Sequence, residues 1–414
     1  MSYIEELGIA AKKAERAVTG ISVQQKNAAL KAISDKLLAC KELIIKENAR
    51  DLETAEANGM SQSMLDRLTL TESRIEAMSE GVLQVMALDD PIGEVLGGRD
   101  LPNGLHIIKK RVPLGVIGII FESRPNVTVD AASLCLKSGN VCILRGGSDA
   151  IHSNKCLVSL MREALKETGV CEDAIALVVD TSRQVAGEMM KLNQYIDVLI
   201  PRGGGGLIRS VMQNSTIPVI QTGEGNCHVY VDRFADIGMA VSIVDNAKTQ
   251  RPSVCNAIEN VLVHKDVAEQ FFTALAKKWD GKVKFIGDEE TAKYVTVEHI
   301  AADEDYRKEF LDYVIAAKVV KSIDEAIDHI NRFGTKHSEC IVTINLDSAE
   351  KFQQTVDAAA VYVNASTRFT DGFEFGLGAE IGISTQKLHA RGPMGLEALT
   401  TYKYLINGKG QIRQ

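Results

Sequence analysis

The pattern of apolar and polar positions changes character at about residue 90. Before that point apolar residues recur at helical spacing. Ser22 with Gln25 makes a capping-box pattern ahead of an amphipathic stretch that runs to about Cys40. Thr71 is expected to open another helix, which ends before Pro91. The first 90 residues therefore predict a run of helices.

After this helical region, short runs rich in β-branched residues alternate with helical patterns. Buried strands that alternate with helices indicate a parallel sheet with helices on its faces. One set of strands is expected at 116–121, 141–145, 175–179, 198–200 and 219–220, and a second at 229–231, 261–264, 283–286, 341–344 and 361–363. The two sets predict two α/β units.

Two segments fall outside this alternation. Leu101 to Leu105, with Pro-Asn-Gly at its centre, has the composition of a hairpin turn between short strands. The last strand expected, Tyr402 to Ile406, is well separated in sequence from the others. The pattern leaves open whether it pairs with the early hairpin or with another subunit.

Composition and charge then exclude several classes. The 414 residues include 47 basic and 55 acidic side chains, whereas nucleic-acid-binding proteins normally carry a basic excess. No apolar run approaches the roughly 20 residues of a membrane helix, and the N-terminus lacks a signal-peptide core. The eight cysteines are scattered, with no C-x-x-C or H-E-x-x-H. We therefore expect a cytoplasmic protein with no metal site and neither a nucleic acid nor a membrane as partner.

Two glycine-containing turns follow expected strands. Gly203, Gly204, Gly205 and Gly206 lie between a strand and a helix, where backbone N–H groups can approach a phosphate. A flexible turn is the alternative, but four glycines in a purely structural turn are entropically costly. Arg145, Gly146, Gly147 and Ser148 repeat the arrangement after an earlier strand. An arginine there suits a phosphate or a ribose hydroxyl, and a solvated strand end is the alternative. Two such turns in one sheet favour a nucleotide site.

Two residues have the chemistry for covalent catalysis. Cys255 lies in a polar, basic segment in which Lys248 and Arg251 can lower the pKa of the thiol. The alternative for any free cysteine is a small buried apolar residue. Asn126 follows a strand, and its amide can donate to an oxyanion. A role as a turn residue that caps the next helix is the simpler interpretation of Asn126 alone.

The segment around Cys255, Arg251-Pro-Ser-Val-Cys-Asn-Ala, resembles the γ-glutamyl phosphate reductase (glutamate-5-semialdehyde dehydrogenase) family of the aldehyde dehydrogenase superfamily. The likeness covers nearly the whole chain through 113–128, 200–204, 222–232, 320–341 and 382–397. Within 320–341 one residue departs from the family's pattern, because Phe333 stands where His or Tyr is expected. The same segment holds His329 and His337, whose spacing is not that of a zinc site and indicates surface polarity or helix capping at Gly334.

The resemblance implies an aldehyde dehydrogenase-like fold of two α/β (Rossmann-type) domains and a small β arm. The NADPH-binding domain is expected at 1–98 and 109–228 with part of 367–396, and the catalytic domain at 229–366. The arm, 99–108 and 397–414, would mediate assembly into a homo-oligomer, a dimer or a tetramer. This would place the terminal strand beside the early hairpin.

The resemblance also implies the reaction. NADPH would reduce L-glutamyl 5-phosphate to L-glutamate 5-semialdehyde, with release of phosphate and NADP, as the second step of proline biosynthesis. Cys255 would form a thioester, while Asn126 and the backbone N–H of Cys255 would hold the oxyanion. Because the likeness begins near residue 1, a separate glutamate 5-kinase is expected to supply the substrate.

The remaining assignments depend on position and charge. The expected cofactor-binding residues are Arg145, Gly146, Ser148, Gly203, Gly204, Gly205 and Glu224, and the expected substrate-binding residues are Arg124, Arg251, Lys387 and Arg391. Whether NADPH is preferred over NADH stays open, because Arg145 suits either a ribose or a phosphate. Gln221 stands where hydrolytic relatives carry a glutamate that activates water, although a small alignment shift would put Glu224 there.

Two alternatives stay open at this point. One is another member of the superfamily, either a hydrolytic aldehyde dehydrogenase or an acyl-CoA reductase, which phosphate dependence would distinguish. The other is a nucleotide-binding or scaffold protein that has lost activity. Protection of a thiol by substrate would distinguish that case.

Overall fold

The computed structural model describes residues 2–413, which divide into two compact units. Of the described residues, unit 1 comprises 2–221, 376–382 and 394–413, and unit 2 comprises Thr222–Phe375 and Ile383–Pro393. The division after Gln221 lies a few residues before the domain boundary expected at 228/229. Which unit carries which function stays a prediction.

Helices fill the first part of unit 1, as the sequence pattern predicts. They are α1 (Tyr3–Val18), α2 (Val23–Ala39), α3 (Lys41–Ala57), α4 (Gln62–Leu68) and α5 (Glu72–Ala87). The capping box at the start of α2 is confirmed, because Ser22 Oγ accepts from Gln25 N–H and Gln25 Oε1 accepts from Ser22 N–H. Thr71 caps α5 through a single bond, in which its Oγ1 accepts from Arg74 N–H at 3.3 Å. Helix α2 packs against α5, where Ser34 Oγ and Ser79 Oγ lie 2.7 Å apart, and its apolar side chains Leu30 and Ile33 are buried.

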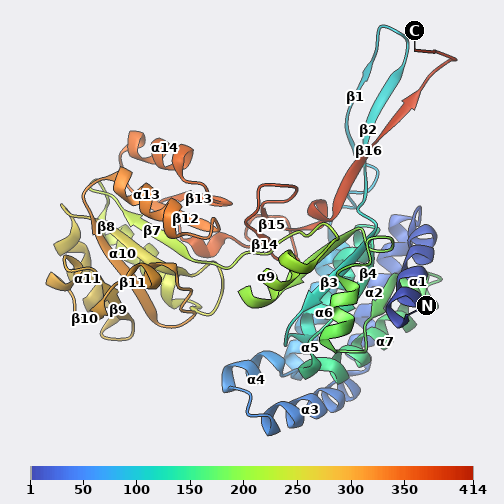
Figure 1. Cartoon of the computed structure of the whole chain (residues 1–414), viewed down its shortest axis with the longest axis horizontal. Helices are drawn as coiled ribbons and strands as arrows, with labels where there is room; N and C mark the ends of the chain where they lie inside the picture. The colour runs from blue at the N-terminus through green and yellow to red at the C-terminus, as the bar shows by residue number, and fades with distance from the viewer. Residues whose placement is uncertain (1, 414) are drawn as a thin grey trace. The chain divides into compact units, whose positions relative to one another are not determined.

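The sheet of unit 1 has four parallel strands in the order β5-β4-β3-β6. They are β3 (Val116–Phe121), β4 (Val141–Arg145), β5 (Ile175–Leu177) and β6 (Val198–Arg202), with α6 (Pro125–Lys137), α7 (Ile151–Glu167), α8 (Arg183–Met189) and α9 (Gly205–Asn214) between and after them (Figure 1). Four of the five expected strands are confirmed. The fifth, at 219–220, forms only an isolated bridge between Val219 and Leu199.

The strand order of this sheet reverses next to β3. From β3 the chain proceeds outward through β4 and β5, and it then returns to the other side of β3 to form β6. The loops after β3 and β6 therefore flank a topological switch point at the carboxyl edge of the sheet. Open α/β sheets bind ligands at such a point.

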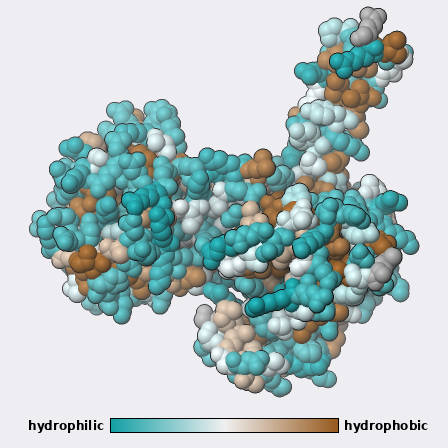
Figure 2. Space-filling view, viewed as in Figure 1, coloured by the Kyte–Doolittle hydropathy of each residue, from teal (hydrophilic) through white to brown (hydrophobic). Residues whose placement is uncertain are grey.

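A separate three-stranded antiparallel sheet forms the arm in unit 1. Strands β1 (Val95–Asp100) and β2 (His106–Pro113) make the expected hairpin, and β16 (Thr400–Asn407) pairs with β2 (Figure 1). The open question about the last strand is thus answered in favour of the hairpin. The strands extend beyond 99–108 on both sides. Exposed apolar side chains on the arm include Val95 and Ile406, and Figure 2 shows hydrophobic patches there.

Unit 2 is built on a parallel sheet of seven strands in the order β10-β9-β11-β8-β7-β12-β13. In chain order they are β7 (Cys227–Val231), β8 (Ile258–His264), β9 (Lys284–Gly287), β10 (Val297–Ile300), β11 (Val314–Val320), β12 (Ser338–Val342) and β13 (Ala360–Val363). The five expected strands are confirmed, with β12 starting earlier than predicted. Strands β10 and β11 were not predicted, although β11 lies near the middle of the sheet.

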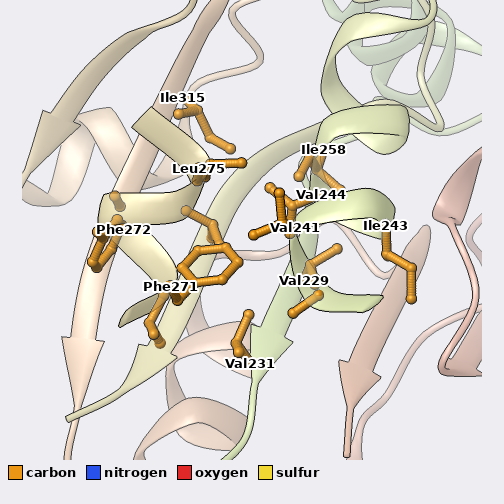
Figure 3. Packing of buried hydrophobic residues seen from close by; sticks show 14 of the residues in the cluster. Val229, Val231, Val241, Ile243, Val244, Ile258, Phe271, Phe272, Leu275 and Ile315 are labelled. Atoms are coloured by element: carbon orange, nitrogen blue, oxygen red, sulfur yellow. The ribbon is translucent and has the colours of Figure 1, made fainter. Parts of the chain in front are cut away.

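Helices cover both faces of this sheet. Val229 and Val231 of β7 pack with α10 (Ile237–Thr249) and α11 (Ala268–Trp279) (Figure 3). Phe271 and Phe272 of α11 belong to the same buried core. Tyr230, which points to the opposite face, packs with α13 (Ile323–Phe333) and α14 (Leu346–Thr355). Because both faces are buried, the polar loops of unit 2 gather at the edges of its sheet.

Short elements complete the fold. The short helix α12 (Asp303–Arg307) lies between β10 and β11, and η4 (Thr367–Phe369) follows β13. Strands β14 (Ile383–Ser384) and β15 (Gly392–Pro393) pair antiparallel. Within residues 2–413, no helix is long and apolar enough to cross a membrane.

Candidate active site

The amino-terminal edge of the unit 2 sheet carries two of the residues singled out above, Cys255 and His337, and also Gly225. Cys255 lies in the loop before β8, Gly225 in the segment before β7, and His337 directly before β12. Because the strands are parallel, their amino ends share one edge, and neighbouring strands are about 4.8 Å apart. The fold therefore places Cys255 at the centre of a polar edge.

Close backbone packing fixes the position of Cys255. A Cβ built on Gly225 would lie 1.5 Å from the carbonyl oxygen of Cys255, so only glycine fits beside this loop. The same carbonyl accepts a hydrogen bond from Cys227 Sγ at 3.2 Å. Cys227 is buried, and burial raises the pKa of its thiol well above the ordinary value. Cys255 itself is partly exposed, as a nucleophile must be.

The residue after Cys255 anchors the loop to η4. Asn256 Nδ2 donates to the carbonyl oxygens of Thr370, at 2.9 Å, and Arg368, at 3.3 Å. In return, Thr367 Oγ1 donates to the Asn256 carbonyl at 2.7 Å. The loop that carries the thiol is therefore held by hydrogen bonds from Asn256 to residues 367–370 and by the close contact with Gly225.

The structure corrects the role expected of Lys248. Its side chain is fully buried at the end of α10, where Nζ donates to Glu259 Oε2 at 2.5 Å and to the Ile258 carbonyl at 3.0 Å. The Lys248 charge is paired with Glu259 inside the core, so Lys248 is not one of the cations expected to act on the Cys255 thiol. Arg368, which the sequence analysis missed, lies near the loop together with Arg251. Burial lowers the pKa of Arg368, and so does the charge of Arg251, whereas Cys255 acts in the opposite direction.

His329 and His337 are buried, so the expectation of surface polarity is wrong for both, while Gly334 does end α13. His337 Nδ1 lies 2.7 Å from Ser338 Oγ, and burial lowers its pKa to about 4. The ring of His329 packs edge-on against Tyr306, and burial lowers its pKa to about 2. Phe333, the residue that departs from the family pattern, packs 4.6 Å from His329 and makes an apolar contact there.

A second cationic group lies at the same edge of unit 2. Lys387 and Arg391, both expected to bind substrate, converge on Asp357 at 3.1 and 2.8 Å. Lys336 joins them at 2.9 Å, and these hydrogen bonds hold the pKa of Asp357 well below its ordinary value. Three cations around one carboxylate leave a net positive charge. Sequence reasoning missed Asp357 and Lys336, because nothing local links them to residues 387–391.

Asn126 and Arg124 lie at the carboxyl edge of the unit 1 sheet. Arg124 is the cap residue of α6, and Asn126 lies in the first turn of that helix. Asn126 Nδ2 donates to Asp130 Oδ2, one turn further along, at 3.0 Å. Burial raises the pKa of Asp130 to about 6. Asp130 was not predicted; it orients the amide that the sequence analysis selected as an oxyanion donor.

The turn after β4 is suited to a ligand with hydroxyl or phosphate groups. Arg145 Nη2 donates to the Thr181 carbonyl at 2.6 Å, whereas its buried Nε has no hydrogen-bond partner among the described residues. A Cβ on Gly146 would lie 2.2 Å from Asn154 Nδ2, so this position requires glycine. Ser148 opens the short helix η1 (Ser148–Ala150) at the same edge.

The glycine run has a different arrangement from the one expected. Gly204 caps α9, and its N–H donates to Glu122 Oε2 at 2.9 Å across the switch point. A Cβ on Gly203 would lie 2.4 Å from the same oxygen, while Gly205 already belongs to the helix. A carboxylate at this helix end favours a hydroxyl group over a phosphate as a neighbouring ligand, because a phosphate would repel it. Glu122 was not predicted.

Gln221 and Glu224 fall on either side of the division between the units. Gln221 ends the main segment of unit 1, and Glu224 lies in the segment that leads into β7 of unit 2. The other expected cofactor residues all lie in unit 1. No group of three or more His, Cys, Asp or Glu side chains suited to a metal occurs in the described part of the chain.

Comparison with known proteins gives a consistent result. Residues 3–296 match the model of the aldehyde dehydrogenase family. The chain is 58% identical over 407 residues to a γ-glutamyl phosphate reductase of Clostridium botulinum (strain Eklund 17B / Type B), covering 98% of both chains. It is 55% identical over 415 residues to the γ-glutamyl phosphate reductase of Lachnospira eligens, with full coverage of both.

A solved structure shows the same fold throughout. The crystal structure of γ-glutamyl phosphate reductase from Thermotoga maritima matches with a TM-score of 0.97 at 47% identity, covering 100% of both chains. The family match, the two curated relatives and this solved structure agree with one another. The chain therefore belongs to the γ-glutamyl phosphate reductases of the aldehyde dehydrogenase family.

Proposed function

We propose that this chain reduces L-glutamyl 5-phosphate to L-glutamate 5-semialdehyde with NADPH and releases phosphate, through a thioester on Cys255. The observation that carries the proposal is the setting of Cys255. Cys255 is a partly exposed residue, its backbone is fixed by Gly225 and Asn256, and Arg251 and Arg368 provide positive charge nearby. A fixed, partly exposed thiol in an electropositive setting is the arrangement that favours a nucleophilic thiolate.

Each protein group has a defined task in this reaction. The Cys255 thiolate attacks the acyl carbon, and phosphate leaves with the electrons of the broken C–O bond. Asn126 Nδ2–H and the Cys255 backbone N–H stabilise the oxyanion, and loss of one such donor typically lowers the rate about a hundred- to a thousandfold. Lys387 and Arg391, with Arg124 and Arg251, are the groups proposed to orient the anionic substrate.

The carboxyl edge of unit 1 fits a nicotinamide dinucleotide. The orphaned Nε of Arg145, the glycine at position 146 and the hydroxyl of Ser148 can hold phosphate or ribose groups. Glu122 suits a ribose hydroxyl, and Gly203 leaves it the space to reach Gly204. When bound, the cofactor supplies the hydride that converts the thioester to the aldehyde. Gln221 in place of a water-activating glutamate supports attack by phosphate over hydrolysis.

Two partnerships accompany this function. A separate glutamate 5-kinase would supply the unstable acyl phosphate. The arm of β1, β2 and β16 would pair this chain with further copies of itself.

The reverse reaction tests the proposal directly. Glutamate semialdehyde and NADP are supplied with and without inorganic phosphate, and NADPH absorbance is followed. We expect a signal only with phosphate. A signal without phosphate would mean that water resolves the thioester, and Glu224 would become the suspected base.

Substitution of the nucleophile provides the matched test. Cys255→Ser should abolish turnover while NADPH binding, measured by fluorescence, is retained. Cys40→Ser, at a partly exposed cysteine of unit 1, serves as the control and should retain activity. Turnover in the Cys255 variant would refute the assignment of the nucleophile.

A further inference from the structure

The loop that carries Cys255 is attached at both ends to a single arginine. Near the start of the loop, Gln250 Oε1 accepts a hydrogen bond from Arg368 Nε at 2.9 Å. At its end, Asn256 Nδ2 donates to the Arg368 carbonyl at 3.3 Å. Arg368 therefore lies along the segment that holds Arg251 and Cys255, and hydrogen bonds fix both its side chain and its backbone.

The outer part of this guanidinium remains available to a ligand. The bond to Gln250 uses Nε, and within residues 2–413 no protein acceptor takes a hydrogen bond from either Nη group of Arg368. Arg368 is half-buried, and its neighbour Arg251 carries the same charge. Asp371 and the Cys255 thiolate are the principal negative groups that act on Arg368. Two like charges held near each other are destabilising by themselves, and an anion bound to both would relieve that repulsion.

We propose that Arg368 and Arg251 together bind the phosphoryl group of the substrate beside Cys255. The inference rests on the function proposed above and adds the residue that holds the leaving group. In the acylation step the S–C bond forms, the C–O bond to phosphate breaks, and phosphate departs with that electron pair; nothing is oxidised or reduced. The two guanidinium groups take up the charge that grows on the departing oxygen.

Position favours the phosphate over the α-carboxylate of the substrate. The phosphoryl group is bonded to the carbon that Cys255 attacks, whereas the α-carboxylate lies at the other end of the glutamyl chain. Arg368 is attached to the Cys255 loop itself. The group of Lys336, Lys387 and Arg391 around Asp357 lies before β12 and β13, which are two and three strands away from β8. Because these strands lie on the order of 10–15 Å from β8, this group is farther from the Cys255 loop than Arg368 is, and it suits the end of the substrate that is remote from the attacked carbon.

The first experiment needs no turnover. Iodoacetamide labelling of Cys255 is followed by mass spectrometry at matched ionic strength, with chloride replaced stepwise by inorganic phosphate. Bound phosphate should neutralise the arginines, raise the pKa of the Cys255 thiol and slow labelling in a saturable way. In Arg368→Gln, labelling in chloride should require higher pH, and phosphate should have no effect. Arg368→Lys should restore part of the phosphate effect.

Arg233→Gln is the matched control. It removes one positive charge from an exposed arginine of unit 2 that follows β7, at the opposite edge of the sheet. This variant should label as the wild type does, with and without phosphate. Equal loss of the phosphate effect in both variants would show that net charge alone is responsible and would overturn the proposal.

Kinetics of the reverse reaction provide the second readout. Arg368→Gln should raise the KM for phosphate about tenfold to a hundredfold, the effect of losing a hydrogen bond to a charged group. The KM values for semialdehyde and NADP should change by less than about twofold, because neither is a ligand of Arg368. A raised KM for semialdehyde with an unchanged KM for phosphate would assign Arg368 to the α-carboxylate and overturn the proposal.

The two experiments separate this inference from the proposed function. Phosphate protection that depends on Arg368, in a wild-type protein that does not oxidise semialdehyde, would support the anion site and refute the proposed substrate. Phosphate-dependent turnover with no effect of Arg368→Gln on labelling or on the KM for phosphate would support the function and refute the site. Thermal unfolding confirms that each variant is folded.

Discussion

At the scale of single residues, Gly225 occupies a position that leaves no room for a side chain. A Cβ there would overlap the Cys255 carbonyl oxygen at 1.5 Å, and both residues lie in segments held by neighbouring strands. Gly225→Ala must therefore move the loop of the nucleophile. Because a displacement of about 1 Å can lower the rate about a hundredfold, we expect at least that loss in kcat.

Gly238→Ala is the control for this variant. Gly238 lies in the first turn of α10, and a Cβ there would meet only Asp236 Oδ1, at 3.4 Å. Turnover and the rate of Cys255 alkylation are measured in both proteins. Wild-type values in Gly225→Ala would show that the loop adapts, and that the close contact has no role in positioning the thiol.

Asp130 is a positioning residue in this scheme, because it acts through Asn126. Its carboxylate can only accept, so it turns the Nδ2 side of the Asn126 amide towards itself and fixes which way the amide faces. An asparagine at position 130 can both donate and accept, so the Asn126 amide could face it with either its nitrogen or its oxygen. In Asp130→Asn we expect kcat to fall about tenfold, less than the loss from removing an oxyanion donor.

The pH dependence separates this role from a structural one. Burial raises the pKa of Asp130 to about 6, so the carboxylate that orients Asn126 is lost as pH falls through 6. The wild-type kcat should therefore decline on the acid side with an inflection near 6. That inflection should be absent in Asp130→Asn, while the KM for substrate is unchanged in both proteins.

At the scale of elements, α13 packs onto β7 through a histidine that makes no hydrogen bond in the described structure. His329 contacts the rings of His228, Tyr306 and Phe333, and both its ring nitrogens are buried without a partner. Burial lowers its pKa to about 2, below the unfolded value near 6.5. As pH falls below 6.5 the unfolded chain binds a proton that the folded chain does not, so stability falls.

This sign gives a quantitative prediction for His329→Phe. At pH 5 the wild type should lose about 2 kcal/mol of unfolding free energy through His329 relative to pH 7 or above. The variant replaces the imidazole with a phenyl ring, which cannot bind a proton, so its stability should depend less on pH. Asp130 and Glu259, whose pKa values burial raises, act in the opposite direction but are present in both proteins. The free energy of unfolding of both proteins is measured by urea denaturation from pH 5 to pH 8. If it changes with pH by the same amount in the wild type and in the variant, the prediction is refuted.

The sequence predicted elements well where one periodicity dominates. The capping box at Ser22, the four strands of unit 1 and the hairpin followed from local patterns. Strand β11 did not, because Ala316, Ala317 and Lys318 dilute its β-branched residues, and it becomes a strand through pairing with β8 and β9. Arg368 and Asp357 were missed for a related reason: their partners lie far away in the sequence.

The site was predicted to a similar extent. Cys255 and Asn126 were identified from local chemistry and resemblance, and their roles stay predictions. Lys248 was misread because sequence proximity does not reveal that its side chain turns into the core towards Glu259. His329 and His337 were misread as polar surface because burial depends on how α13 and β12 pack.

At the scale of the whole molecule, the arm offers a surface for self-association. Tyr402, Tyr404 and Ile406 alternate along β16 and are all exposed, so they share one face of the three-stranded sheet. If this face is covered by another copy, Ile406→Lys should reduce the molar mass measured by light scattering. Lys403→Glu, on the alternate side of the same strand, is the control. An unchanged oligomer in the first variant would place the interface elsewhere.

The order in which unit 1 is completed has a consequence for synthesis. The chain passes between the units after Gln221, Phe375, Gly382 and Pro393, and β16 pairs with a strand formed nearly 300 residues earlier. On the ribosome, unit 2 is fully synthesised before the last strand of unit 1 emerges. A premature stop near the C-terminus would thus damage the unit that was begun first, and neither unit can be excised as one continuous fragment.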